Sequence, residues 1–171
     1  MKNTGKTQIT KNLKEKSILV SRFFDAPIEK VWQAYTDSEL LDQWWGPSPW
    51  KAETKSLNFE KGGYWVYAMV GPENEKQWSR MNYLSINTYK SIDVEDAFCD
   101  ENGNLNREMP IGKGRIIFIP EKNGVRVEFK STYPSEEDLN KLVEMGFEEG
   151  ISVCYDQLDG LLKELVHTHQ R

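Results

Sequence analysis

The sequence predicts an α+β fold in which a curved antiparallel sheet of about seven strands wraps around a long C-terminal helix. Residues 145–166 have the spacing of a long, one-sided helix. Residues 50–133 contain strand-like segments in succession without an intervening helix, as in an antiparallel meander. Two short helices after the first strand complete the predicted order of elements.

The C-terminal helix is predicted from apolar residues that recur every three or four positions. They are Phe147, Ile151, Cys154, Tyr155, Leu158, Leu161, Leu162 and Leu165. This spacing places them on one face of a helix, with acidic residues and Lys163 on the other. The apolar face runs for about five turns, roughly 30 Å. Because most of the upstream chain is strand-like, we expect a sheet to cover it.

Residues 1–16 are expected to form a disordered basic tail in front of a single domain at residues 17–167. They carry five lysines and one glutamate, for +4, whereas the rest of the chain carries 17 bases and 26 acids, for −9. An acidic body argues against nucleic acid as a partner. There is no signal-peptide core and no run of about 18 apolar residues, so we expect a cytoplasmic protein without membrane insertion.

The first strand and two short helices are predicted at residues 17–47. Residues 17–24 are rich in β-formers, and Pro27 suits the first turn of a helix that follows. Ile28, Val31, Trp32 and Tyr35 mark the inner face of that helix. Thr36 and Glu39 have the spacing of a capping box for a second helix at residues 39–44, which ends at Trp45-Gly46-Pro47.

Strands are predicted next at residues 50–59, 63–70, 77–87, 90–99, 112–120 and 124–133. Asn123-Gly124 is a strong hairpin signal between the last two. Ser135 is then the expected N-cap of a helix, with Asp138 at the capping-box position. Gly146 and Gly150 are expected to break or bend the chain before the long helix.

Three motifs carry a resemblance to a known family. Residues 26–47 resemble the opening signature of the START-like (SRPBCC, helix-grip) superfamily, in the branch named after the activator of the heat-shock-protein-90 ATPase. Residues 62–72 and 146–150 are similar to two further motifs of that branch. The resemblance covers residues 17–166. It implies a deep, mostly apolar cavity between the concave face of the sheet and the terminal helix, although this fold hosts many functions.

The candidate ligand-binding residues lie on the elements that would enclose this cavity. Trp45 is interpreted either as part of a core plug or as a residue of the cavity rim. Alternation along the strand at 63–70 places Trp65, Tyr67 and Met69 on one face, as a ligand wall or as ordinary core. The full candidate set is Trp45, Trp65, Tyr67, Met69, Arg80, Tyr83, Asp96, Phe98, Phe147, Ile151 and Tyr155.

Asp96 is an acidic residue on an otherwise apolar strand face, which it shares with Ile92, Val94 and Phe98. A buried carboxylate without a partner is costly, so Arg80 or Arg115 is expected to neutralise it. The alternatives are a structural ion pair, an acid at the solvated end of a strand, and a polar anchor or general acid in the cavity.

The sequence predicts neither a metal site nor a cofactor. His167 and His169 form a His-x-His pair at the end of the chain, which is too few ligands for a specific site. Cys99 and Cys154 are expected to be free thiols. The glycine pairs do not have phosphate-loop spacing, and no Gly-x-Ser-x-Gly elbow occurs. Catalytic chemistry therefore has little support.

Three functions follow from these observations. The first is a non-enzymatic domain, a monomer or weak homodimer, that binds a small hydrophobic or aromatic molecule between the sheet and the terminal helix. The second, implied by the branch, is a chaperone co-factor that stimulates an ATPase by surface contact. The third, implied by the superfamily, is an enzyme of the cyclase or dehydratase type, for which Asp96 with an arginine is the candidate constellation.

Overall fold

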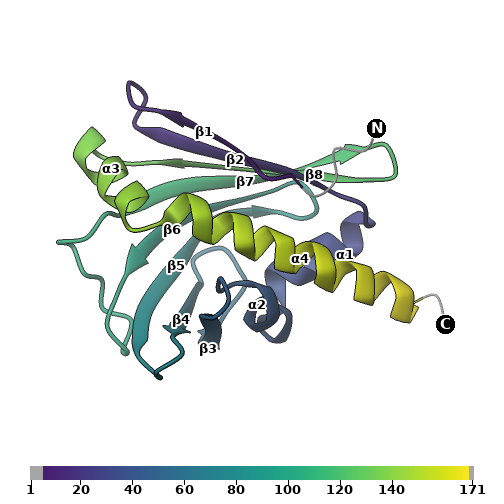
Figure 1. Cartoon of the computed structure of the whole chain (residues 1–171), viewed down its shortest axis with the longest axis horizontal. Coiled ribbons are helices and arrows are strands. Elements are labelled where there is room, and N and C mark those ends of the chain that lie inside the picture. The colour runs from purple at the N-terminus through teal and green to yellow at the C-terminus, as the bar shows by residue number, and fades with distance from the viewer. Residues whose placement is uncertain (1–5, 170–171) are drawn as a thin grey trace.

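The computed structural model describes residues 6–169 and the side chains of residues 6–167. Helices and strands follow the predicted order, and Figure 1 shows how they lie in space. The elements are β1 (Gln8–Asn12), β2 (Ser17–Phe24), α1 (Ile28–Thr36), α2 (Ser38–Trp44), β3 (Lys51–Leu57), β4 (Tyr64–Val70), β5 (Lys76–Asn87), β6 (Ser91–Phe98), β7 (Gly112–Glu121), β8 (Gly124–Thr132), α3 (Glu136–Glu144) and α4 (Phe147–His169).

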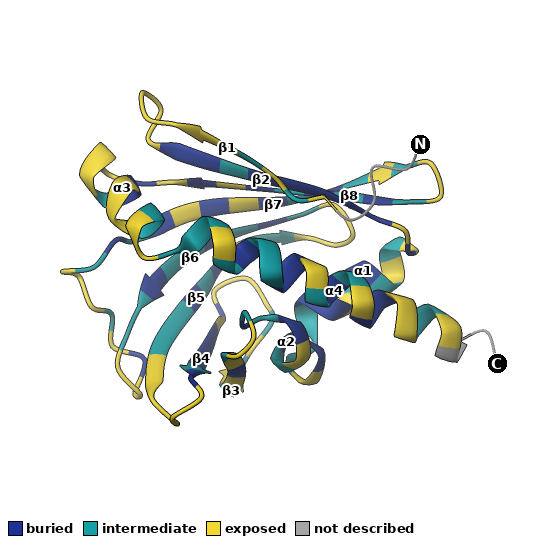
Figure 2. Ribbon diagram, in the orientation of Figure 1, coloured by how far each residue is buried: buried dark blue, intermediate teal, exposed yellow. Residues whose placement is uncertain are grey.

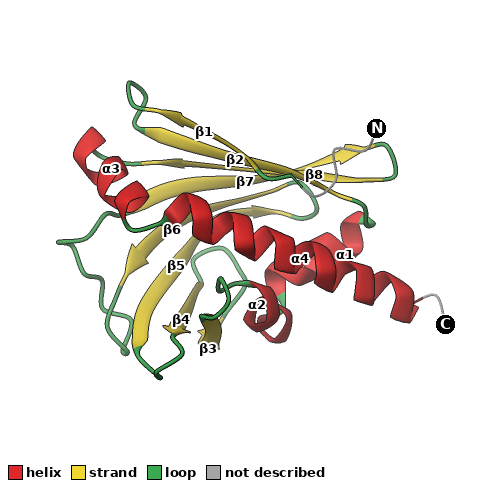
Figure 3. Cartoon of the chain, in the orientation of Figure 1, coloured by secondary structure: helices red, strands yellow, loops and turns green. Residues whose placement is uncertain are grey.

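The strands form one antiparallel sheet in the order β1-β2-β8-β7-β6-β5-β4-β3. The β3–β8 meander has the predicted limits to within two residues. Because β2 pairs with β8, the first predicted strand lies beside the last. The sheet curves around α4, with α1 and α2 on the same side (Figure 3). This arrangement is the predicted helix-grip architecture, with one more strand than expected.

The additional strand is β1, which corrects the expected disordered tail for residues 8–12. β1 pairs antiparallel with β2, from Gln8 opposite Ser21 to Asn12 opposite Ser17. Its residues are mostly exposed, and only Ile9 packs against the core. Backbone hydrogen bonds hold such a polar edge strand, so a hydrophobic pattern cannot reveal it. Residues 1–5, also part of the expected tail, lie outside the described residues.

The N-terminal ends of α2 and α3 show one wrong capping prediction and one confirmed one. The capping box at Thr36 and Glu39 is wrong, because Asp37 caps α2 and accepts a hydrogen bond from the Glu39 backbone N–H. Thr36 instead donates to the Trp32 carbonyl, one turn back in α1. Ser135 caps α3 as predicted and accepts from the Asp138 N–H.

Helix α4 buries the predicted face. Ile151, Cys154, Tyr155, Leu158 and Leu162 are nearly inaccessible to solvent, whereas exposed positions face outward (Figure 2). The helix packs against α1, α2, α3 and β2. Gly146 has a φ of 91°, a backbone conformation that favours glycine, and separates α3 from α4. Gly150, by contrast, lies inside α4 and does not break it.

A charged link joins α4 to the sheet at a position where the strand pattern predicts an apolar residue. Arg22 shares the inner face of β2 with Val20 and Phe24 and is 2% exposed. Its Nη1 lies 2.5 Å from Asp156 Oδ1, and its Nη2 lies 3.9 Å from Asp159 Oδ2. These two ion pairs connect the middle of α4 to β2. Within residues 6–169, no helix is long and apolar enough to cross a membrane.

Candidate functional site

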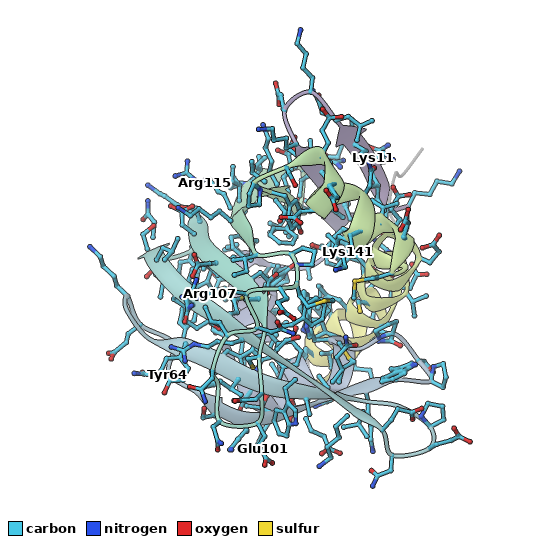
Figure 4. All side chains as sticks on the ribbon, turned by 90° about the vertical axis from the view of Figure 1, so that its left-hand side faces the viewer. Lys11, Tyr64, Glu101, Arg107, Arg115 and Lys141 are labelled. Carbon is cyan, nitrogen blue, oxygen red and sulfur yellow. The ribbon has the colours of Figure 1, made fainter. Side chains whose placement is uncertain are left out.

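A pocket of about 400 Å³ lies between the inner face of the sheet and the start of α4. It is at the end of the molecule where α3 and the β6–β7 loop lie, the end that faces the viewer in Figure 4, with Lys141 of α3 and Arg107 of the loop labelled. Its lining residues come from four strands (β4, β5, β6 and β8), both C-terminal helices and the segments around them. They are Trp45, Pro47, Trp50, Tyr67, Met69, Gln77, Ser79, Asp96, Ala97, Phe98, Pro110, Phe129, Tyr133, Leu142, Met145, Gly146, Phe147, Gly150, Ile151 and Cys154.

The walls of the pocket are mainly aromatic and aliphatic. Alternation along β4 turns Tyr67 and Met69 inward, whereas Tyr64 is exposed on the outer face. Phe98 from the end of β6 and Phe147 and Ile151 from the start of α4 close the space. Seven of the candidate residues therefore line one pocket, namely Trp45, Tyr67, Met69, Asp96, Phe98, Phe147 and Ile151.

Of the neighbouring tryptophans, Trp44 is part of the core and Trp45 lies at the pocket, so both the core-plug and the cavity-rim interpretations apply to this motif. Trp44 is fully buried in the core, and its indole N–H donates to the Ala34 carbonyl at 2.9 Å. Trp45 lines the pocket and packs edge-on against Tyr67, with ring centroids 6.5 Å apart. Its indole N–H is buried and makes no hydrogen bond to a described residue, although the Tyr67 side chain is nearby.

A close approach of the backbone at Gly46 holds Trp45 in place. Gly46 has a φ of 147°, and a Cβ there would lie 2.6 Å from the backbone nitrogen of Ala52. The Gly46 N–H also lies 3.4 Å from the Cys154 sulfur of α4. On the next turn of α4, Gln157 donates to the carbonyls of Trp44 and Gly46. Only glycine fits this connection between α2, β3 and α4.

Asp96 lies in the pocket without the arginine expected to neutralise it. In the sheet it is opposite Met81 of β5 and Gly112 of β7. Its carboxylate makes no hydrogen bond or ion pair with the part of the chain that the structure describes. Burial without a compensating charge raises the pKa of Asp96 to about 7.

Both arginine predictions are wrong, because the sheet register places these side chains elsewhere. Arg80 is opposite Ala97, one residue from Asp96, and so points to the other face of the sheet. There its guanidinium lies 3.8 Å from the centre of the Tyr64 ring and donates to the Gly103 carbonyl. Arg115 instead forms two hydrogen bonds with Asp93.

Three further candidates lie in the packed core and not in the pocket. Trp65 stacks on Tyr67 with ring centroids 4.2 Å apart. Trp65, Tyr83 and Tyr155 border a second, much smaller void of about 20 Å³. The Tyr155 hydroxyl lies 3.3 Å from that of Tyr35, and burial raises the pKa of both phenols. These rings support the pocket wall from behind.

The sequence analysis did not predict one part of the pocket lining, in which two aromatic rings pack over glycines of β7. Phe129 and Tyr133 line the pocket, and both are nearly inaccessible to solvent. A Cβ on Gly114 would lie 2.4 Å from Phe129 Cε1, and one on Gly112 would lie 2.7 Å from Tyr133 Cε1. Glycines at alternate positions of a strand opposite an aromatic strand were the available signal. Ser79 and Gln77, on β5, were also missed.

Metal-binding and nucleophilic groups make little contribution to this site. No cluster of three potential metal ligands occurs within the described residues. His167 is exposed, and the side chain of His169 lies outside those described. Both cysteines are free thiols, and burial raises the pKa of Cys154 to about 12, which keeps its thiol protonated and unreactive.

An antiparallel sheet that grips a C-terminal helix, with two short helices after β2, defines a helix-grip domain of the START-like class. The family model described as "Activator of Hsp90 ATPase homolog 1-like protein" matches residues 25–163, and the chain belongs to this family. The branch predicted from the motifs is therefore confirmed. A search of curated proteins found no match.

Solved bacterial structures share the fold over nearly the whole chain. Protein Ms6760 from Mycobacterium smegmatis is 30% identical with a TM-score of 0.85, covering 91% of this chain and 96% of that one. A protein from Arthrobacter aurescens is 31% identical with a TM-score of 0.86, covering 92% and 91%. A protein from Staphylococcus epidermidis is 30% identical with a TM-score of 0.80, covering 92% and 94%.

Proposed function

We propose that this protein binds a small hydrophobic or aromatic molecule, without chemical conversion, in the pocket between the sheet and α4. The observation that carries the proposal is the pocket of about 400 Å³. That volume falls in the range of ligand sites, roughly 300–1,000 Å³, which are typically lined by apolar side chains with a few polar groups. The polar groups here are Gln77, Ser79 and Asp96.

The apolar walls set the affinity to be expected. A ligand that loses roughly 300 Å² of apolar surface gains about 7 kcal/mol at 25 cal/mol per Å². Lost translational and rotational freedom offsets part of this gain. Micromolar dissociation constants follow, with selectivity left to the polar groups. Met69 and Met145 add adaptable walls that fit ligands of different shape.

The absence of an assembled catalytic group among the described residues favours binding over conversion. Cys154 is held as a neutral thiol, and Asp96 has neither a basic partner nor an orienting one. A cyclase or dehydratase activity would rest on Asp96 alone, whose pKa of about 7 suits a general acid.

The second candidate function is the stimulation of a chaperone ATPase through surface contact. It is favoured by the description of the family model that the chain matches. For either function we propose a cytoplasmic monomer or weak homodimer that does not bind nucleic acid, because the body of the chain is acidic.

Ligand titrations with three variants of β4 residues test the binding proposal. An environment-sensitive apolar dye and a panel of small aromatic compounds are titrated while tryptophan fluorescence is followed. Met69→Trp fills the pocket and Tyr67→Ala removes a wall, so both should change the dissociation constant while circular dichroism stays native. Tyr64→Ala is the matched control, because Tyr64 is on the same strand but exposed on the opposite face.

Saturable micromolar binding that the two pocket variants alter, and the control does not, would support the proposal. Equal effects of all three variants would place binding outside the pocket. If nothing in the panel binds below millimolar concentration, the binding function is wrong and surface contact becomes the leading candidate.

A further inference from the structure

The charged side chains that line the pocket are acidic and not basic, and this indicates the class of ligand. Asp96 is an acidic lining residue, and within the described residues the lining contains no lysine, arginine or histidine. From this arrangement we propose that the ligand is an amine: an apolar or aromatic body that carries an ammonium group, bound by the Asp96 carboxylate. This inference rests on the proposed binding function and specifies its ligand.

The surroundings of Asp96 leave its carboxylate in need of a partner. Its neighbours across the sheet, Met81 and Gly112, offer no polar side chain, and Phe98 follows it on the same face of β6. Asp96 is partly buried and faces the pocket, and carboxylates that have lost much of their contact with water are usually hydrogen-bonded or paired with a cation. Asp96 has no such partner in the described chain. An ammonium group in the pocket would provide both the charge and the hydrogen-bond donors.

The aromatic walls favour the same ligand class. Trp45, Tyr67, Phe98, Phe129, Tyr133 and Phe147 all line the pocket. The faces of aromatic rings attract ammonium groups, and the attraction is stronger where water is excluded. The carboxylate group of a ligand such as a fatty acid would not be attracted to the ring faces and would be repelled by ionised Asp96. An aromatic pocket with one carboxylate therefore selects cations over anions.

The groups around Asp96 also set the pH dependence. The titratable side chains that face it are the phenols of Tyr67 on β4, Tyr83 on β5 and Tyr133 after β8, together with the Cys154 thiol on α4. Burial raises the pKa of all four, so they stay neutral near pH 7. Asp96 alone changes charge there. A permanently charged ammonium should bind more tightly as the pH rises through about 7.

Three matched probes test the ligand class: phenylbutylamine, the neutral phenylbutanol and the anionic phenylbutyrate. Each is titrated into the full chain by isothermal calorimetry. The dissociation constant of the amine should be at least about tenfold lower than that of the alcohol, and the carboxylate should bind more weakly than both. Asp96→Asn should remove the preference for the amine. Glu95→Gln is the matched control, since it removes the same charge from the adjacent residue, on the outer face of β6.

The pH series supplies a test that needs no variant. Phenylbutyl-trimethylammonium stays charged at every pH, so its affinity for the unmodified protein should increase from about pH 6 to about pH 8. The affinity of phenylbutanol should not increase.

Any other result contradicts either the proposed ligand class or the proposed binding function. If the three probes bind equally, or the amine preference persists in Asp96→Asn, the pocket binds apolar molecules but the ligand class is wrong. Flat pH dependence of the ammonium would also refute the role of Asp96. If no probe binds, the proposed binding function itself fails.

Discussion

Helix α4 should depend strongly on Leu158, which lies at the middle of its buried face. Leu158 has no solvent-accessible surface and belongs to the main core cluster. Replacing it by alanine removes three carbon atoms from the interior. At about 0.8 kcal/mol per buried carbon, the loss of burial alone costs about 2.4 kcal/mol.

The cavity left behind adds to this cost. Leu158 lies at the centre of a helix that α1, α2 and β2 support, so its neighbours cannot collapse fully into the space. A residual cavity of roughly 50 Å³ contributes about 1.2 kcal/mol. We therefore expect Leu158→Ala to lower the free energy of unfolding by about 3–4 kcal/mol.

Urea denaturation followed by tryptophan fluorescence measures the effect. With a slope of about 2 kcal/mol per molar urea, the midpoint should fall by about 1.5–2 M. Leu158→Met nearly preserves the volume and should cost less than about 1.5 kcal/mol. Lys163→Ala changes an exposed side chain of the same helix and should have little effect. A midpoint unchanged by Leu158→Ala would refute the assignment of the buried face.

Further predictions concern the helix, its link to the sheet, the pocket acid and the first strand. Gly160→Ala should raise the free energy of unfolding by about 1 kcal/mol, because Gly160 lies inside α4 and a Cβ there meets no atom within 4 Å; a lower thermal midpoint would contradict this. Asp156→Asn should lower the free energy of unfolding, measured in urea, by about 1 kcal/mol, because it weakens the interaction with buried Arg22. The loss is limited because the side chain at position 156 is exposed to water. Asp96→Asn should stabilise the ligand-free protein, and the gain should increase from about pH 4 to about pH 7. The reason is that ionisation of a carboxyl whose pKa is raised from 3.8 to about 7 by folding lowers the free energy of unfolding, by roughly 4 kcal/mol at most. If the difference in unfolding free energy between the two proteins does not change with pH, Asp96 is well solvated. Deleting residues 1–12 should cost at least about 1 kcal/mol, because it removes the backbone bonds of β1 and the contacts of Ile9, and an unchanged midpoint would mean that β1 adds nothing.

The arrangement of elements could be predicted from the sequence because it depends on short-range periodicity. The apolar face of α4 follows from spacings of three and four, and each strand of the β3–β8 meander ends near a turn signal. Ser135 caps α3 where the pattern placed it. These signals come from residues close together in the chain, where backbone geometry alone determines which side chains share a face.

Strand β1 escaped prediction for a different reason. Its residues are polar and mostly exposed, so no burial pattern marks them. The strand exists because the open edge of β2 offers hydrogen-bond partners to the chain that precedes it. The stabilising groups are backbone amides, which every sequence has, and their use depends on the neighbouring strand.

The pocket shows most clearly what the sequence determined and what only the tertiary structure decided. The alternation of β4 and the periodicity of α4 determined that Tyr67, Met69 and Ile151 would face inward, and the family motifs identified the fold. Whether Asp96 would meet Arg80 depended on the register between β5 and β6, where a shift of one residue moves a side chain to the opposite face. The position of Phe129 likewise depended on the space above Gly114 of a neighbouring strand. Local periodicity determines which side chains face the interior, but only the packing of distant strands decides which of them meet and which charge is left without a partner.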